Sequence, residues 1–530
     1  MPPAAAEVFH GELLRTLEEF FLQHPRAVVM EEGRVAFDMA AAHYSLSAQN
    51  GRCLLHLWSE ERNLARIVCG LWERNGTLRI EGRRFGQTRP QVFEISPGGD
   101  RCLPSTRNAE RAKYRYLLER VLTREFPEWS LESMRTAPDL EHSFGPAYAR
   151  GVLRRGQMAW AVIAINSGET QQAVDGILTL GILWLAQCRE HAGGKRLFEG
   201  LRIIVPAGMF ATIQARMAWL NTSAAKYSLC ELSERTEELM EVDCSRSGNL
   251  HLKLAHAFDP KSATDRCRKA LNHVLALLDP GLKALTETRA NGPAEVSLAL
   301  YGLEFARIRR QASVNAFSHR EVITFGAGAN ETPLTAENEE FFSDLTRRLF
   351  ENRHAGGTMR NPLYRLQPER WLESMLRADI GEIEPTIRGD IVYTQVPAFS
   401  AGDRGMLDLL TVTNAGRLAV IEIKADDDLH LPLQALDYWC RVRQLHCEGA
   451  FQRYGYFRGI ELSDKAPLLF LIAPALRIHP ATDTVLRHLS PEIPWELIGL
   501  NEDWRVRRKV ILRKRSEGWA VSLPPSTVML

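Results

Sequence analysis

Short segments with alternating or continuous apolar residues dominate the first hundred residues, a pattern typical of β-strands. After these strands, apolar residues recur at helical spacing in two segments, and a short, strongly apolar segment lies between the two. The pattern predicts strands at 52–58, 64–72, 77–85, 160–165 and 201–205, and helices at 109–124 and 170–190. Residues 225–290 are more polar, and we predict that they are mainly helical.

The second half of the chain shows a similar succession. It is β-rich from Glu295, and a helix is predicted from Thr335, because acidic residues fill its first turn and basic residues its last. Further helices are predicted at 368–377 and 433–445, and strands at 406–412, 418–423 and 468–472. Strands and helices mixed in this way predict an α/β (α+β) fold.

Short signatures recur in the same order in the two halves. AVIAIN at 161–166 is similar to AVIEIK at 419–424, and LRIIVPA at 201–207 is similar to LFLIAPA at 469–475. The separation between the matches changes slowly along the chain, as insertions would produce. Chance similarity among apolar strands is the alternative, but the shared order favours two related modules, each a β-rich subdomain followed by an α/β domain.

The composition is that of an ordinary globular protein, with 530 residues, 45% of them hydrophobic and 25% charged. This length predicts several domains. The formal net charge of +1 excludes a globally basic nucleic-acid coat. Nine cysteines form no CxxC pair, which favours free thiols in a reducing compartment. We see no signal peptide and no membrane span, so we expect a cytoplasmic protein.

Candidate chemistry is concentrated in one hairpin of the second half. Glu422 and Lys424 lie two apart on the apolar strand 418–423, so their side chains point to the same face. Buried acidic and basic side chains are rare unless they are paired or bind a metal. Asp408 lies on the preceding strand, and a turn at 414–416 would bring it beside Glu422. Two carboxylates and a lysine suit Mg²⁺-assisted hydrolysis of a phosphodiester by a metal-activated water.

These residues resemble the PD-(D/E)xK nuclease superfamily, which has a restriction-endonuclease-like fold. Residues Gly405–Asp408 resemble the GxxD form of its first motif, and Glu422–Lys424 resemble its ExK motif. Gln434 and Tyr438 resemble the QxxxY helix motif of the RecB-type and resolvase-like branches. Glu373 resembles the acidic residue on the preceding helix. The resemblance covers roughly a fifth of the chain.

The resemblance implies a role for each residue. Asp408, Glu422 and the backbone carbonyl of Ile423 would hold Mg²⁺, with Mn²⁺ as a substitute. Lys424 would serve the attacking water, and the two residues of the helix motif would position the site or contact the DNA backbone. The implied catalytic residues are Asp408, Glu422, Lys424, Glu373, Gln434 and Tyr438.

Each of these residues also has a purely structural interpretation. Glu422 and Lys424 could form a salt bridge on a half-exposed strand, and Asp408 could be a structural acid near a turn. The QxxxY pair could interact on the helix surface. Glu373 could be a solvated helix acid.

The first half lacks the same chemistry. The matching signatures place Ala164 at the position of Glu422, Asn166 at that of Lys424, and Arg150 at that of Asp408. No cation could be held there, so the first α/β domain would be a degenerate copy. The predicted segments are a β-rich subdomain at 1–105, a degenerate nuclease-like domain at 106–225, a helical connector at 226–290, a second β-rich and helical subdomain at 291–360, and a nuclease-like domain at 361–530.

The sequence thus predicts a Mg²⁺-dependent DNA nuclease, with RNA as another candidate substrate and no membrane partner. Its protein partners are not indicated. The alternative is a non-catalytic DNA-binding or scaffold protein of a repair or defence complex that keeps a relic site. A basic run at 505–515 fits either a phosphate-binding stripe or a charged edge strand.

Overall fold

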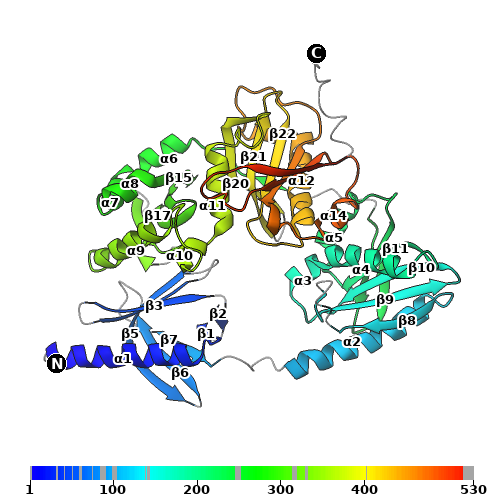
Figure 1. Cartoon of the computed structure of the whole chain (residues 1–530), viewed down its shortest axis with the longest axis horizontal. Coiled ribbons are helices and arrows are strands. Elements are labelled where there is room, and N and C mark those ends of the chain that lie inside the picture. Colours follow the sequence, from blue (N-terminus) through cyan, green and yellow to red (C-terminus); the bar gives the residue numbers. More distant parts are fainter. Residues whose placement is uncertain are drawn as a thin grey trace. The chain divides into compact units, whose positions relative to one another are not determined.

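Two compact units make up the chain (Figure 1). The first comprises Met1–Arg101 and Phe258–Met375, and the second comprises Cys102–Ala257 and Leu376–Leu530. Each unit therefore combines one segment from each half of the sequence. The computed structural model describes residues 3–31, 34–40, 42–49, 52–58, 63–74, 76–83, 91–97, 104–137, 139, 144–244, 252–312, 319–328, 332–400 and 403–516.

The first unit begins with a seven-stranded antiparallel sheet in the order β2-β1-β7-β6-β5-β4-β3. Its strands are β1 (Val28–Glu31), β2 (Arg34–Asp38), β3 (His43–Gln49), β4 (Arg52–Trp58), β5 (Asn63–Arg74), β6 (Thr77–Arg83) and β7 (Gln91–Ser96). Helix α1 (Pro3–Gln23) packs on this sheet. Its residues Leu13, Leu17 and Phe20 form one apolar stripe that joins Leu55 and Val68 in a buried cluster.

The second sheet of this unit has five antiparallel strands in sequence order. They are β15 (Thr286–Gly292), β16 (Glu295–Leu300), β17 (Leu303–Ala312), β18 (His319–Phe325) and β19 (Thr332–Pro333). The surrounding helices are α6 (Pro260–Arg266), α7 (Arg268–Ala276), α8 (Pro280–Leu285), α9 (Glu339–Asn352), α10 (Pro362–Arg365) and α11 (Pro368–Ala378). Val274, Phe305 and Phe342 share a buried cluster with Leu54 and Trp58 of β4, so the two sheets have a common core.

The second unit contains a six-stranded mixed sheet in the order β13-β12-β11-β10-β9-β8. The pairs β10·β11 and β11·β12 are parallel, and the other neighbours are antiparallel. The strands are β8 (Ser130–Arg135), β9 (Tyr148–Arg155), β10 (Met158–Ile165), β11 (Leu197–Pro206), β12 (Lys226–Ser233) and β13 (Glu238–Glu241). Helices α3 (Gln171–Asp175), α4 (Ile177–Ala192) and α5 (Ala211–Met217) connect the parallel strands, and α2 (Pro104–Glu125) covers the other face.

Its other sheet has seven strands in the order β14-β20-β21-β22-β23-β24-β25. They are β14 (Lys253–Leu254), β20 (Ile387–Ser400), β21 (Asp403–Thr413), β22 (Leu418–Ile423), β23 (Leu468–Pro474), β24 (Trp495–Leu500) and β25 (Val510–Arg515). The helices are α12 (Leu431–Cys447), α13 (Ala450–Arg453) and α14 (Thr482–Leu486), with the 3-10 helix η1 (Ala475–Arg477). The pairs β22·β23 and β23·β24 are parallel and the rest antiparallel. The directions and order of β20 to β25 therefore repeat those of β8 to β13.

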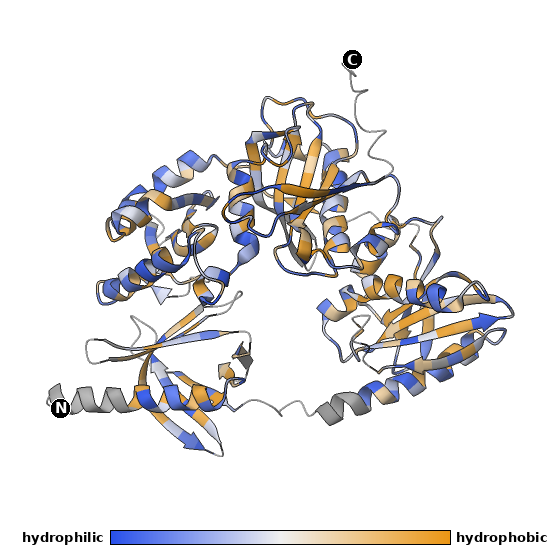
Figure 2. Ribbon diagram, in the orientation of Figure 1, coloured by the Kyte–Doolittle hydropathy of each residue, from blue (hydrophilic) through white to orange (hydrophobic). Residues whose placement is uncertain are grey.

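One hydrophobic core extends through both sheets of the second unit. Leu178 of α4, Ile203 of β11, Val420 of β22 and Trp439 of α12 belong to the same buried cluster. Figure 2 shows the hydrophobic residues concentrated in the central strands of the mixed sheets. A mixed α/β structure is thus confirmed.

Two predictions of secondary structure are wrong. Residues 226–241, expected to be part of a helical connector, form β12 and β13 of the six-stranded sheet. The side chains of β13 are mostly exposed, so this edge strand lacks the apolar signal of a central strand. The helix expected at 170–190 is divided into α3 and α4 at Gly176.

Among the described helices, none is both long and apolar enough to cross a lipid bilayer. The described cysteines have free thiols, as the sequence predicts. Cys102 lies outside the described residues.

Candidate functional site

The site predicted from the sequence lies on the β21–β22 hairpin. Leu409 pairs with Ile421 across the two strands, so the next position brings Asp408 opposite Glu422. Opposite residues of an antiparallel pair project from the same face. The connecting turn requires a glycine, because Gly416 has a φ of +74° and a Cβ there would lie 2.2 Å from the carbonyl oxygen of Glu461.

Strand β22 is buried along its whole length. Its residues Leu418 and Val420 point into the core beneath α12, and alternation places Glu422 on the same face. The side chain of Glu422 is only 3% exposed. The half-exposed strand of the structural interpretation is therefore wrong, although Glu422 and Lys424 do form the ion pair that it expects.

Three charged side chains meet at the end of this strand. The Asp408 carboxylate accepts a hydrogen bond from the Ile423 N–H at 3.0 Å, which fixes the orientation of Asp408. The Lys424 Nζ lies 4.0 Å from Glu422 Oε1 and 3.4 Å from Asp428 Oδ2. Asp408 and Glu422 thus lie opposite each other on the hairpin, and Lys424 lies beside Glu422. Their catalytic roles stay predictions.

Tyr438 lies on helix α12, near these carboxylates. Burial raises the pKa of Tyr438, and the nearby negative charges of Glu422 and Asp408 raise it further. The Arg441 guanidinium lies 5.9 Å from the centre of the Tyr438 ring. Gln434, one turn earlier on the helix, is half-buried. Tyr438 is therefore half-buried and near the two carboxylates instead of lying on an exposed helix surface.

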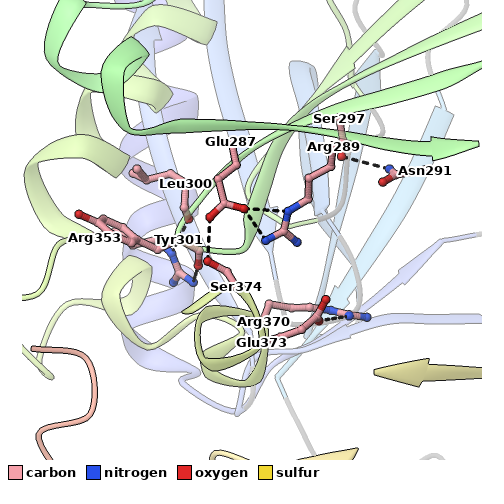
Figure 3. A network of polar contacts seen from close by, with 10 residues as sticks. All are labelled: Glu287, Arg289, Asn291, Ser297, Leu300, Tyr301, Arg353, Arg370, Glu373 and Ser374. Carbon is pink, nitrogen blue, oxygen red and sulfur yellow. Dashed lines mark hydrogen bonds and ion pairs between the residues drawn. The ribbon is translucent and has the colours of Figure 1, made fainter. Parts of the chain in front are cut away.

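Glu373 lies in the first unit, in a polar network on α11 (Figure 3). Its side chain is 2% exposed and accepts a hydrogen bond from Arg370 Nη1 at 2.5 Å. The adjacent Ser374 donates a hydrogen bond to Glu287 of β15, which also pairs with Arg289. Glu373 is therefore not a solvated helix acid. Its expected place beside the metal ligands stays a prediction.

The oxygen donors at the hairpin suit a hard divalent cation. Within the described ranges, no group of three or more His, Cys, Asp or Glu side chains is arranged to hold a metal. The set expected from the sequence is smaller, with the carboxylates of Asp408 and Glu422 and the carbonyl of Ile423. Mg²⁺ commonly binds through one or two carboxylates and keeps several waters, so this set fits Mg²⁺.

Several basic side chains of the C-terminal run at 505–515 form ion pairs with acidic side chains of the same protein. Arg513 pairs with Glu496 at 2.6 Å and with Glu384 at 2.9 Å, and Glu496 is fully buried. The other ion pairs of the run join Arg508 to Glu382, Lys514 to Asp483, and Arg515 to Glu496. Because β25 is the last strand of its sheet, these contacts favour a charged edge strand over a phosphate-binding stripe.

Sequence reasoning did not single out the residues that hold α12 in place. Asp437, next to Tyr438, pairs with Arg216 of α5, and His430 before the helix contacts Thr179 of α4. No local pattern marks these pairs, because their members lie more than 200 residues apart in the chain.

Comparison with known proteins does not assign this site to a family. The chain matches no protein-family model, and no curated protein matches it.

Proposed function

We propose that this protein is a Mg²⁺-dependent nuclease of the PD-(D/E)xK type that hydrolyses DNA phosphodiester bonds in the cytoplasm. The proposal rests mainly on the meeting of Asp408, Glu422 and Lys424 at the end of a buried strand, with Tyr438 beside them. Burying charged side chains is costly, and such an arrangement is typical of a functional site.

Each residue of the site has a defined task in this proposal. A bound Mg²⁺ would polarise the phosphate and lower the pKa of a water. Asp408, oriented by the Ile423 N–H, and Glu422 would supply the carboxylate ligands. Lys424 would orient the attacking water or neutralise charge that develops on the phosphate. Gln434 and Tyr438 would position the scissile phosphate from α12.

We also propose that the two α/β domains of the second unit arose by duplication. The repeated order and directions of their six strands support this. Under this proposal, the hydrogen-bonded register of the strands favours a match between the two domains that is shifted by one residue from the match of the signatures. Glu422 pairs with Leu471, and Ile163 pairs with Ile203, which the matching signatures equate with Leu471. Ile163, and not Ala164, therefore corresponds to Glu422.

The corresponding place in the first α/β domain has no carboxylate pair. Arg150 lies directly opposite Ile163 and so corresponds to Asp408. Its guanidinium lies over the rings of Phe144 and Trp184, at 4.3 and 5.6 Å, and donates a hydrogen bond to the carbonyl of Ala137. A buried cation and two aromatic rings fill this place, which supports a degenerate first copy.

Cutting assays test the nuclease activity. Wild type, Lys424→Ala and Lys226→Ala are incubated with plasmid, single-stranded DNA and RNA in Mg²⁺ or Mn²⁺. Lys226 is the matched control, because it also pairs with a glutamate but is 67% exposed. We expect wild type and the control to cut DNA, and Lys424→Ala to be slower by about 100-fold or more.

Two outcomes contradict the proposal. Cutting that persists in Lys424→Ala places the activity at another site or in a contaminant. Failure of the wild type to cut any of these substrates in either metal favours a non-catalytic scaffold. Cutting of RNA alone would reassign the substrate.

A further inference from the structure

Helix α12 is held from the side by the first α/β domain. Trp219, which follows α5, meets Trp439 edge to face with ring centres 4.9 Å apart. The Arg443 guanidinium lies 4.9 Å from the centre of the Trp219 ring. These contacts belong to the second unit and extend its common core.

The strongest polar contact joins Arg216 to Asp437. Arg216 donates from Nε and Nη2 to the two oxygens of Asp437 at 2.8 and 2.7 Å, and from Nη1 to the carbonyl of Asp175 at 2.5 Å. The Arg216 side chain is only 6% exposed. A two-pronged contact of this kind fixes orientation as well as distance. Asp437 is adjacent to Tyr438, so the contact controls how α12 presents Tyr438.

A second contact holds the start of the helix. The His430 Nδ1 lies 3.0 Å from the hydroxyl of Thr179, which is fully buried on α4. The His430 ring also packs closely on Gly176, where an added Cβ would lie 2.9 Å from His430 Cε1. His430 and Asp437 are seven residues apart, which is about two helical turns, so both contacts lie on one side of α12.

We propose that the first α/β domain positions the nuclease site, with Arg216 as a positioning residue that holds α12, and with it Tyr438, against the strand that carries Glu422. The kinetic part of this inference rests on the proposed nuclease function. The degenerate domain thus keeps a role through its contacts with the helix of the other copy.

The test compares Arg216→Met with Arg202→Met in the full chain. Arg202 is the control, because it is an arginine of the same domain whose guanidinium packs on the rings of Phe126 and Trp160. The Arg202 side chain lies on the face of β11 that α2 covers, away from α12. Amide hydrogen exchange of α12 is measured in each variant, together with kcat, KM and the Mg²⁺ concentration for half-maximal cutting.

Arg216→Met should speed exchange of the α12 amides by at least about tenfold. It should lower kcat by about 10- to 100-fold, because small displacements of positioning groups are costly. The Mg²⁺ requirement should stay near wild type, because the expected ligands lie on β21 and β22. Arg216→Lys should cut faster than Arg216→Met, since lysine keeps the positive charge but cannot donate to both oxygens of Asp437 in the way the planar guanidinium does. Arg202→Met should change none of these quantities.

The inference is overturned if Arg216→Met matches Arg202→Met in both exchange and kcat. It is also overturned if Arg216→Met speeds exchange throughout the unit and weakens Mg²⁺ dependence equally, since this would indicate a general structural role. A wild type that does not cut DNA refutes the nuclease function, while the exchange data still decide whether Arg216 holds α12.

Discussion

Replacing Lys424 by methionine tests the electrostatics of the site without DNA. The substitution keeps an unbranched side chain of similar length but removes the positive charge next to Glu422. In the absence of a divalent cation, Glu422 would then be a buried carboxylate near Asp408 whose negative charge is less well compensated. We expect the β22 region to be destabilised by about 3 kcal/mol.

The magnitude follows from distance and burial. Unit charges separated by the 4.0 Å between Lys424 and Glu422 attract by roughly 4 kcal/mol at an effective dielectric constant of about 20. Asp428 is 24% exposed, so its contact with Lys424 adds less, about 1 kcal/mol at most. The pair of Lys226 with Glu199 is shorter, at 3.2 Å, but Lys226 is 67% exposed. Lys226→Met should therefore cost less than about 1 kcal/mol.

Native-state amide hydrogen exchange of β22 at neutral pH, with a metal chelator present, measures these differences. Adding the substitution Glu422→Gln to Lys424→Met should recover most of the loss, because the uncompensated charge is removed. Mg²⁺ should also recover part of it. If Lys424→Met is no less stable than Lys226→Met, the reasoning is refuted and Lys424 does not compensate the charge of Glu422.

Three further predictions concern single residues. Glu422→Gln should abolish Mg²⁺-dependent cutting but leave the metal-free protein at least as stable as wild type. Thermal unfolding with a chelator measures this stability, and a loss of stability would contradict the prediction. Burial lowers the pKa of His488 to about 4 from 6.5, so the unfolded chain binds a proton that the folded state does not, and stability falls as the pH drops from about 6.5 to 4. The loss is about 3 kcal/mol, and urea unfolding of His488→Gln should show a weaker dependence in this range. Arg513→Met should lower stability by about 2–3 kcal/mol, because the buried Glu496 loses one of its two arginine partners and keeps only Arg515. The dependence of DNA affinity on salt concentration should keep its slope; a shallower slope would instead assign Arg513 to phosphate contact.

Central strands were predicted well because burial on both faces leaves a continuous apolar run. Strand β4 at 52–58 and β22 at 418–423 have the bounds that the sequence predicts. Edge strands carry a weaker signal, and β13 was mistaken for helix because its side chains are mostly exposed. Its neighbour β12 is mostly buried but mixes polar residues with apolar ones, so it lacks the continuous apolar run of the central strands. The break at Gly176 was also missed, since a single glycine inside an apolar helical pattern does not by itself predict a break.

The proposed duplication illustrates why local similarity is insufficient. Matching AVIAIN with AVIEIK places Ala164 at the position of Glu422, whereas under the proposed duplication the strand pairing favours Ile163. A shift of one residue turns a side chain to the opposite face of a sheet. Only the hydrogen-bonded register decides which face each residue occupies.

Strand period and turn length alone are enough to predict that Glu422 and Lys424 share a face and that Asp408 can reach them through a short hairpin. These relations are local, because the period of a strand and the length of a turn set them. Tertiary structure alone decided that Arg216 meets Asp437 and that Thr179 meets His430. Such contacts arise when two separately encoded domains bury their apolar faces together, and no spacing within either segment specifies the partner.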